Sequence, residues 1–391
     1  MLRLEKRPNP SQFWNYATPV VAVLLTMVAG GILFWVLGKN PFEAIKLIFW
    51  DPLFSEQFAA YSRPQLLIKA GPLILIAVGL AIGFRAGIWN IGAEGQYIIG
   101  ALCAAQMALW FYPAEQWIIS PQFIPLPEFI IRGEWIVFPL MILAGAFGGW
   151  LWAMIPAVLK TRFNTNEILV SLLLVYVAEK ILAAAATGFM RNPEGSGFPG
   201  SRNIFNYNAA SNQELIANSG LHWGVVAAFI AVIFAYVLLH RHLLGFHVQL
   251  AGQAPRAAKF AGVAPARLVL LCLGISGLMA GLAGMFEVAG PARLITIDFN
   301  SGYGFTAIIV AFLGRLHPIG IVLAGLLLAL TYIGGELAQF MLNLPSAAIQ
   351  VFQGMLLFFL LALDVLSNYR LRLMRPAPVT APAPKPSTES V

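Results

Sequence analysis

The chain alternates long hydrophobic runs with short polar segments. Eight runs are long enough to cross a bilayer, since about 20 apolar residues span a hydrocarbon core of about 30 Å. They cover residues 17–38, 66–82, 135–159, 165–188, 222–240, 266–290, 317–340 and 346–367. Two more runs are less regular: residues 93–112 begin in a glycine-rich stretch, and residues 302–314 are too short to cross unaided. The pattern predicts an all-α polytopic membrane protein with eight to ten spans.

Composition supports the view that lipid is the solvent of this chain. Of its 391 residues, 59% are hydrophobic and 10% are charged, whereas a soluble domain carries about 25% charged residues. The net charge of +7 does not indicate nucleic acid, because the basic residues lie in separate loops and form no single patch. No small-residue cleavage site follows the first run, so we expect a retained helix rather than a signal peptide.

Lysine and arginine set the predicted orientation. If the N-terminus is cytoplasmic and each span reverses direction, most of the 24 basic residues fall inside. This bias predicts both termini in the cytoplasm, with the spans in the cytoplasmic (inner) membrane. Residues 39–65, 113–134 and 189–221 then form outside loops. We expect residues 1–375 to form one transmembrane domain and the Pro- and Ala-rich residues 376–391 to form a disordered cytoplasmic tail.

A weak internal repeat relates the two halves of the chain. Asn90-Ile91-Gly92 and Ile98-Ile99 recur 210 positions later as Asn300-Ser301-Gly302 and Ile308-Ile309. In the predicted orientation the first copy ends at the inner face and the second at the outer face. Gly-interrupted segments in corresponding positions are typical of transporters built from inverted repeats.

The glycine-rich segment 83–96 is the first candidate site. Each glycine costs a helix about 1 kcal/mol relative to alanine, and broken backbone survives in lipid only if it is buried or lines a cavity. Asn90, Glu94 and Gln96 lie here at membrane depth, where ionisable residues are functional candidates. We predict that they line a translocation pathway. The alternative is an ordinary turn in which Asn90 caps a helix and Glu94 lies in its first turn.

The second candidate site is the cytoplasmic segment 249–264. Pro255 suits the first position of a short helix and Gly262 the position just past its last turn. Ala258 and Gly262 lie one turn apart and give the helix a small-residue side, which we expect to enter a groove on a partner, whereas Lys259 marks a basic side. The alternative is a plain connecting helix held at the lipid headgroups by its basic residues.

A third glycine-rich stretch, residues 301–308, is followed by the Pro-broken segment 314–320. It predicts either a buried helical hairpin or a half-helix aimed at the pore, with Phe305 and Thr306 in the pathway.

The sequence contains no motif for catalysis or metal binding. The chain has no G-x-x-x-x-G-K-[ST] phosphate loop and no H-E-x-x-H motif, and its five histidines are scattered. We therefore expect no catalytic residues, no bound metal, no cofactor and no ATPase site of its own.

These motifs resemble the membrane permeases of bacterial ABC importers for simple sugars and nucleosides, in the ribose and branched-chain amino acid permease superfamily. The resemblance covers nearly the whole chain and is most specific at residues 87–96, which look like the nucleoside-type branch. It implies a cobalamin-importer-like fold of about ten helices, with helices 2–5 and 7–10 related as an inverted pair. It also assigns coupling to the ATPase to Gly252, Pro255, Arg256, Ala258, Lys259 and Gly262.

The resemblance further implies partners: a separate ATPase subunit, a second and often non-identical permease, and an extracytoplasmic solute-binding protein. A nucleoside, or otherwise a simple sugar, would pass through a cavity between the two permeases. Two alternatives stay open. One is an ion-coupled secondary transporter with Glu94, Glu287 and Glu336 as ion sites. The other is an integral-membrane enzyme, against which stands the lack of any clustered His, Cys or carboxylate set.

Overall fold

The hydrophobic runs of the sequence become helices in a computed structural model, which describes residues 2–6, 11–112, 134–195 and 197–373. Eight helices in this described part are long and apolar enough to cross a membrane, so the predicted all-α polytopic architecture is confirmed. They are α1 (Gln12–Val36), α4 (Ala59–Arg85), α7 (Glu134–Phe163), α8 (Glu167–Thr187), α9 (Trp223–Arg241), α12 (Pro265–Ala289), α14 (Pro318–Leu342) and α15 (Ser346–Asn368).

The two less regular runs also form helices, α5 (Ala93–Trp110) and α13 (Tyr303–Leu313). With 11 residues, α13 is about 17 Å long at 1.5 Å per residue, so it cannot cross the hydrocarbon core by itself. It packs against α4, α14 and α5 within the bundle. With the eight long helices, α5 and α13 give the described part of the chain the ten helical segments that the sequence predicts.

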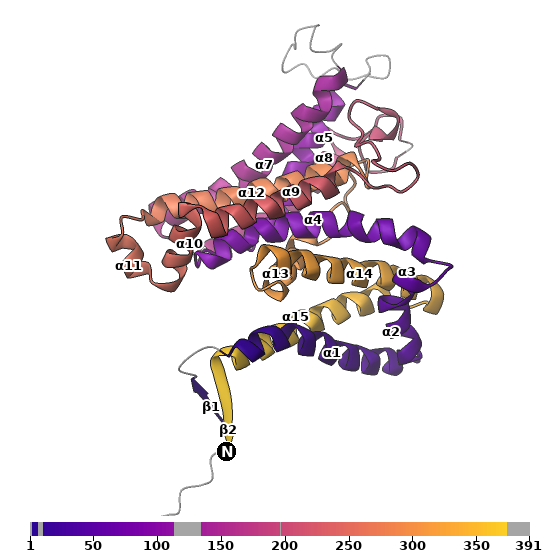
Figure 1. Ribbon diagram of the computed structural model, residues 1–391. Coiled ribbons are helices and arrows are strands. Elements are labelled where there is room, and N and C mark those ends of the chain that lie inside the picture. Colours follow the sequence, from indigo (N-terminus) through magenta and orange to yellow (C-terminus); the bar gives the residue numbers. More distant parts are fainter. Residues whose placement is uncertain (1, 7–10, 113–133, 196, 374–391) are drawn as a thin grey trace, which may run out of the picture.

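Shorter helices lie at the two opposite ends of the bundle (Figure 1). They are α2 (Pro41–Phe49) and α3 (Asp51–Phe54) at one end, and α10 (Leu243–Gln253) and α11 (Pro255–Phe260) at the other. The predicted outside loop 39–65 is therefore largely helical. Asn40 explains where α2 begins, because its side chain accepts a hydrogen bond from the Phe42 N–H at 3.0 Å, and Pro41 suits the first helical position.

The two ends of the described chain meet. Strands β1 (Leu2–Lys6) and β2 (Tyr369–Leu373) pair antiparallel, with Leu2 opposite Leu373, and they extend from the paired helices α1 and α15 (Figure 1). No feature of the sequence predicted this pairing. It places both ends on one side of the bundle, as the predicted orientation requires. The predicted tail and nearly all of the outside loop 113–134 lie outside the described residues.

The inverted repeat is visible in the packing of the helices. Gly92 immediately precedes α5 and Gly302 immediately precedes α13, so the 210-residue spacing relates two helix starts. Helix α4 packs on α13, and its counterpart α12 packs on α5; likewise α4 packs on α14 and α12 on α7. Exchange of partners in this way is the result expected when two copies of one unit are related by a pseudo-two-fold axis.

Small residues bring the central helices close together. Helices α4 and α12 are mostly buried, whereas α1, α8 and α15 are mostly exposed. A Cβ added to Gly281 of α12 would overlap backbone atoms of Gly145 and Gly149 on α7, and one added to Gly284 would overlap the Tyr97 carbonyl on α5. Helices in lipid associate largely through such close packing, because no hydrophobic effect drives them together.

The segment between α8 and α9 is anchored at His222. This buried residue caps α9: its Nδ1 accepts a hydrogen bond from the Gly224 N–H at 3.1 Å and lies 3.1 Å from the side-chain amide of Asn212. The amide oxygen of Asn212 in turn accepts from the Trp223 N–H at 3.3 Å. Burial lowers the pKa of His222 to about 4, so the imidazole is neutral at physiological pH.

Low pH is expected to destabilise the protein at His222. Unfolded histidine titrates near pH 6.5, so between about pH 6.5 and 4 the unfolded state binds more protons and stability falls as pH falls, by up to about 3 kcal/mol. Thermal unfolding of the purified protein at pH 7.5 and pH 5 measures this loss. The His222→Asn variant keeps a capping side chain and should show a smaller loss. The control is His242→Asn, which alters an exposed histidine that caps α10. Between pH 7.5 and pH 5 this variant should lose as much stability as the wild type does.

Candidate functional site

Helix α5 and the half-helix α13 begin side by side in the interior of the bundle. A Cβ on Gly304 would overlap the backbone nitrogen of Glu94 and lie 2.5 Å from its Cα. Both residues are buried. The glycine at 304 is therefore required by a backbone-to-backbone contact between the first turns of the two helices.

Glu94 links the starts of these two helices by hydrogen bonds. Its carboxylate oxygens accept hydrogen bonds from the N–H groups of Gly302 at 3.0 Å and Gly304 at 2.5 Å. The first N–H groups of a helix have no partner within the helix and carry partial positive charge. The alternative reading placed Glu94 in the first turn of its own helix, and it does lie there. The donors that it satisfies, however, belong to α13.

Asn90 and Gln96 form a closed and buried network. The Asn90 amide donates to the Gln96 Oε1 and to the Ser276 Oγ of α12, both at 2.8 Å, and the Gln96 amide donates back at 3.1 Å. Asn90 is not the N-cap of α5, which is Gly92, but its Oδ1 accepts from the Gly92 N–H at 3.0 Å. The network fastens the segment before α5 to α12.

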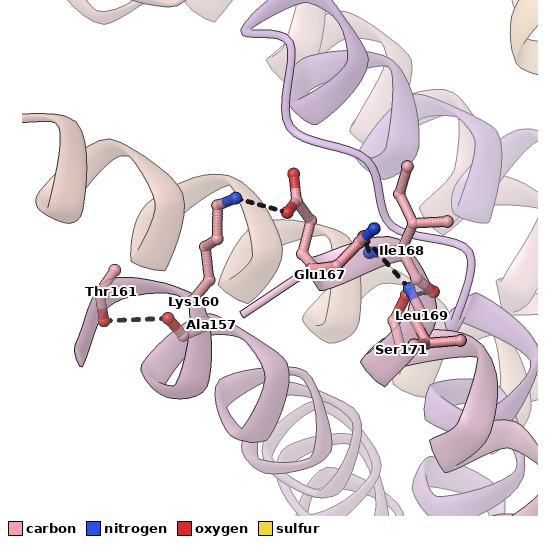
Figure 2. A network of polar contacts seen from close by, with 8 residues as sticks. Ala157, Lys160, Thr161, Glu167, Ile168, Leu169 and Ser171 are labelled. Atoms are coloured by element: carbon pink, nitrogen blue, oxygen red, sulfur yellow. Dashed lines mark hydrogen bonds and ion pairs between the residues drawn. The ribbon is translucent and has the colours of Figure 1, made fainter. Parts of the chain in front are cut away.

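Helix α8 holds the same segment from another side, and Figure 2 shows the polar contacts of the turn between α7 and α8 that fix the start of α8. An ion pair of 2.9 Å joins Lys160 to Glu167, and Asn166 caps α8 by accepting from the Ile168 N–H at 3.0 Å. One turn later, the Ser171 hydroxyl accepts from the N–H of Ile91 at 3.2 Å. The polar backbone before α5 is thus held by helices from both halves of the chain.

The other two predicted pathway residues differ in exposure. Thr306 is buried, and its hydroxyl lies 2.8 Å from the hydroxyl of Tyr332 on α14. Phe305 is 40% exposed. Of the five predicted pathway residues, only Phe305 therefore presents a substantial surface in the single chain. The sequence interpretation missed Tyr332 and, on α4, Lys69; a charge inside the apolar run 66–82 was the signal that pointed to Lys69.

The predicted cytoplasmic helix exists as α11, with Pro255 at its first position. Gly262 follows it with φ of +81°, a conformation that glycine adopts without strain. Gly252 ends α10 against the last turn of α4, where an added Cβ would overlap the carbonyl oxygen of Arg85. The coupling segment thus rests directly on the glycine-rich segment 83–96.

The prediction that the small-residue side of α11 is free to enter a groove on a partner is wrong. Ala258 is 3% exposed and packs into the core of this chain with Ile82, Val263 and Leu268. The small-residue side of the helix therefore faces inward. The outward side carries Arg256, Ala257, Lys259 and Phe260, and the Phe260 side chain is 94% exposed. Helical periodicity alone could divide α11 into two sides but could not say which of them the rest of the chain covers.

Contacts continue from the coupling segment to the second half-helix. The Arg85 Nε donates to the carbonyl of Leu316 at 3.0 Å, in the turn between α13 and α14. The rings of Phe84 and Trp89 stack on Phe312 of α13, with centroids 5.2 and 5.7 Å apart. The segment after α4 therefore touches α10 on one side and the end of α13 on the other.

Comparison with known proteins agrees with this arrangement. The family model for the branched-chain amino acid transport system / permease component matches residues 63–361, which include the half-helices and the coupling segment. The chain belongs to this family. It is the permease subunit of an ABC importer, and its N-terminal helix α1 lies outside the matched region.

Three curated relatives place the permease in the nucleoside and simple-sugar branch. It is 31% identical to the glucose ABC transporter permease protein TsgB13 of Haloferax volcanii, over 94% of this chain and 93% of the relative. It is 26% identical to the guanosine ABC transporter permease protein NupP of Bacillus subtilis, over 90% and 94%. It is also 26% identical to the nucleoside ABC transporter permease protein NupB of Lactococcus lactis, over 88% and 89%. No solved structure matches the permease.

Proposed function

We propose that this permease and a second permease form the path by which a nucleoside or a simple sugar crosses the cytoplasmic membrane. One observation carries the proposal: two half-helices from inverted repeats begin at the same point inside the bundle, and Glu94 bonds one to the other. Discontinuous helices of this kind mark solute sites in transporters. The glucose, guanosine and nucleoside specificities named for the relatives supply the solute class.

Within the proposed path, the five predicted residues have two roles. Phe305, exposed at the start of α13, contacts the solute, and Thr306 orients Tyr332 beside it. Asn90, Glu94 and Gln96 hold the two half-helices in place from within. The path lies in one transmembrane domain, residues 1–375, and solute is delivered to its outer end by an extracytoplasmic binding protein.

ATP is hydrolysed by a separate subunit that docks on the outward side of α11. Arg256, Lys259 and the exposed ring of Phe260 enter a groove on that subunit. Pro255 and Gly262 fix the two ends of the helix. Ala258 and Gly252 do not contact the ATPase in this proposal. Their small size lets α10 and α11 pack closely on α4. Motion of the ATPase then reaches α13 through the contact between Arg85 and Leu316.

Orientation can be tested with single cysteines. We expect a membrane-impermeant thiol reagent to label Gln213→Cys, in the exposed part of the segment between α8 and α9, in intact cells. Gln253→Cys, exposed at the end of α10, should react only after permeabilisation. Labelling of Gln253→Cys in intact cells would contradict cytoplasmic placement of both the coupling segment and the two termini.

Purification and reconstitution test the function itself. The tagged permease, isolated from its native membrane, should carry along an ATPase with a phosphate loop and a second permease. Vesicles holding that complex should take up radiolabelled guanosine or glucose only when ATP and the binding protein are present. Uptake by the purified permease alone, driven by a proton or sodium gradient, would contradict the proposal and support the ion-coupled alternative.

A further inference from the structure

Two opposite charges lie on the surface of the bundle at membrane depth. Lys69 of α4 and Glu336 of α14 are 3.9 Å apart, and 27% and 58% of their side chains are exposed. Glu336 lies six residues before the end of α14, about 9 Å along that helix. Lys69 lies sixteen residues before the end of α4, about 24 Å along that helix, and in the predicted orientation this end is on the opposite side of the membrane. A charge facing lipid here is costly, so this face meets water or another protein.

Polar groups that lack partners lie directly behind this pair. The Lys69 Nζ is 5.8 Å from the centre of the Tyr303 ring, and that ring packs against Tyr97 and Tyr332, with centroids 5.9 Å apart in both cases. The hydroxyl of Tyr97 is fully buried and has no hydrogen-bond partner among the described residues. Buried hydroxyl groups are nearly always paired in native proteins, so this unpaired hydroxyl group marks the interior behind the ion pair as polar.

Glu287 of α12 belongs to the same cluster. It is 8% exposed, and its side-chain carboxyl group makes no hydrogen bond or ion pair with the residues that the structure describes. Its electrostatic neighbours are the Lys69 ammonium group and the hydroxyl groups of Tyr97 and Tyr303. A carboxylate in this position can accept hydrogen bonds from hydroxyl groups, which are the polar groups that neutral sugars and nucleosides carry.

We propose that Lys69, Glu287, Glu336 and Tyr332 form a solute-binding site in the outward-facing part of the path, and that this site takes a neutral, polyhydroxylated ring. The site rests on the proposed function and names the half of the path where the solute is held. The two carboxylates accept from hydroxyl groups and the ammonium donates to one. The exposed faces of Phe305 and Tyr332 pack on the ring.

Charge decides against an anionic solute. One ammonium group faces two carboxyl groups, so the site has no net positive charge with which to attract phosphate or carboxylate. Both Lys69 and Glu336 lie at the surface of this chain, so the second permease of the proposed assembly closes the opposite wall. The selectivity for neutral solutes therefore does not depend on the external binding protein alone.

Cysteine accessibility in the whole importer tests the site. The variants Glu336→Cys and Phe305→Cys are made with Cys103 and Cys272 replaced by alanine, and the permease content of the membrane is measured for each. We expect an impermeant methanethiosulfonate reagent, added outside, to label both at least about tenfold faster than Ile230→Cys, because only a thiol in contact with water ionises and reacts readily. Ile230 is the matched control: it is 60% exposed and lies seven residues from the outer end of α9.

Protection identifies the solute. Guanosine or glucose, whichever the importer takes up, should slow the labelling of both variants, whereas guanosine monophosphate should not. Labelling of both no faster than Ile230→Cys would show that the face meets lipid and would overturn the site. Equal protection by guanosine monophosphate, or none by the transported solute, would overturn the assignment of a neutral ring. If neither solute is taken up, the proposed solute class fails, yet the labelling rates still decide whether this face is wet.

Discussion

Phe260→Ala is expected to weaken the association of the permease with its ATPase by about 2 kcal/mol, roughly 30-fold. The ring is almost fully exposed at the end of α11, beyond the Ala258 side that the permease itself covers. Exposed aromatic side chains on short rigid elements carry much of the binding energy in protein interfaces. Co-purification of the ATPase from detergent measures the loss, and uptake should fall with it while the permease content of the membrane is unchanged.

The matched control is Phe246→Ala. Phe246 lies on the preceding helix α10 and is also exposed, by 57%, but it is not on the outward side of α11. This variant should retain the ATPase. Ala258→Trp should behave differently from both, because a large ring in that core position overpacks the permease and lowers its own stability. A full complement of ATPase on Phe260→Ala would remove α11 from the docking surface.

Gly304→Ala is expected to have the largest effect on stability. The added methyl group would overlap the backbone of Glu94 and Ala93, which no rotation of a side chain relieves. Separating the two helix starts also stretches the bonds from Gly302 and Gly304 to the Glu94 carboxylate. Together these losses should lower the free energy of unfolding by about 3 kcal/mol or more, seen as a lower melting temperature and near-background uptake.

Gly354→Ala provides the comparison. Gly354 lies within α15, and an added Cβ there meets no atom within 4 Å. Alanine favours a helix by about 1 kcal/mol relative to glycine, so this variant should be at least as stable as the wild type. If Gly304→Ala melts at the same temperature as Gly354→Ala, α5 and α13 do not touch as the structure has them.

Local sequence patterns predicted the elements well. Hydrophobic length fixed the eight long helices to within a few residues at most ends. Pro255 and Gly262 marked the bounds of α11, because both residues act through their own backbone conformation. The 210-residue spacing found two equivalent helix starts, Gly92 and Gly302, because each repeat needs a residue there that allows a break in the helix.

Features that depend on contacts between distant segments could not be predicted in this way. Glu94 was predicted to line the pathway, with a place in the first turn of its own helix as the alternative. Neither prediction identified its hydrogen-bond partners, which lie about 210 positions away. Ala258 looked like part of a docking face, because a small residue on a short helix suits either an interface or a core. The pairing of β1 with β2 joins the two ends of the chain, where no motif in either end signals the other.

The meeting of α5 and α13 also balances charge at the centre of the molecule. The start of a helix behaves like about half of a positive charge, so two starts in contact amount to about one. Two like poles held together would repel, and a permeating molecule would meet a positive barrier in a medium that screens charge poorly. The single carboxylate of Glu94 supplies the opposite charge. The positive ends of the two helices thus meet at an acidic group of the chain itself, which opposes their dipoles at the centre of the permease.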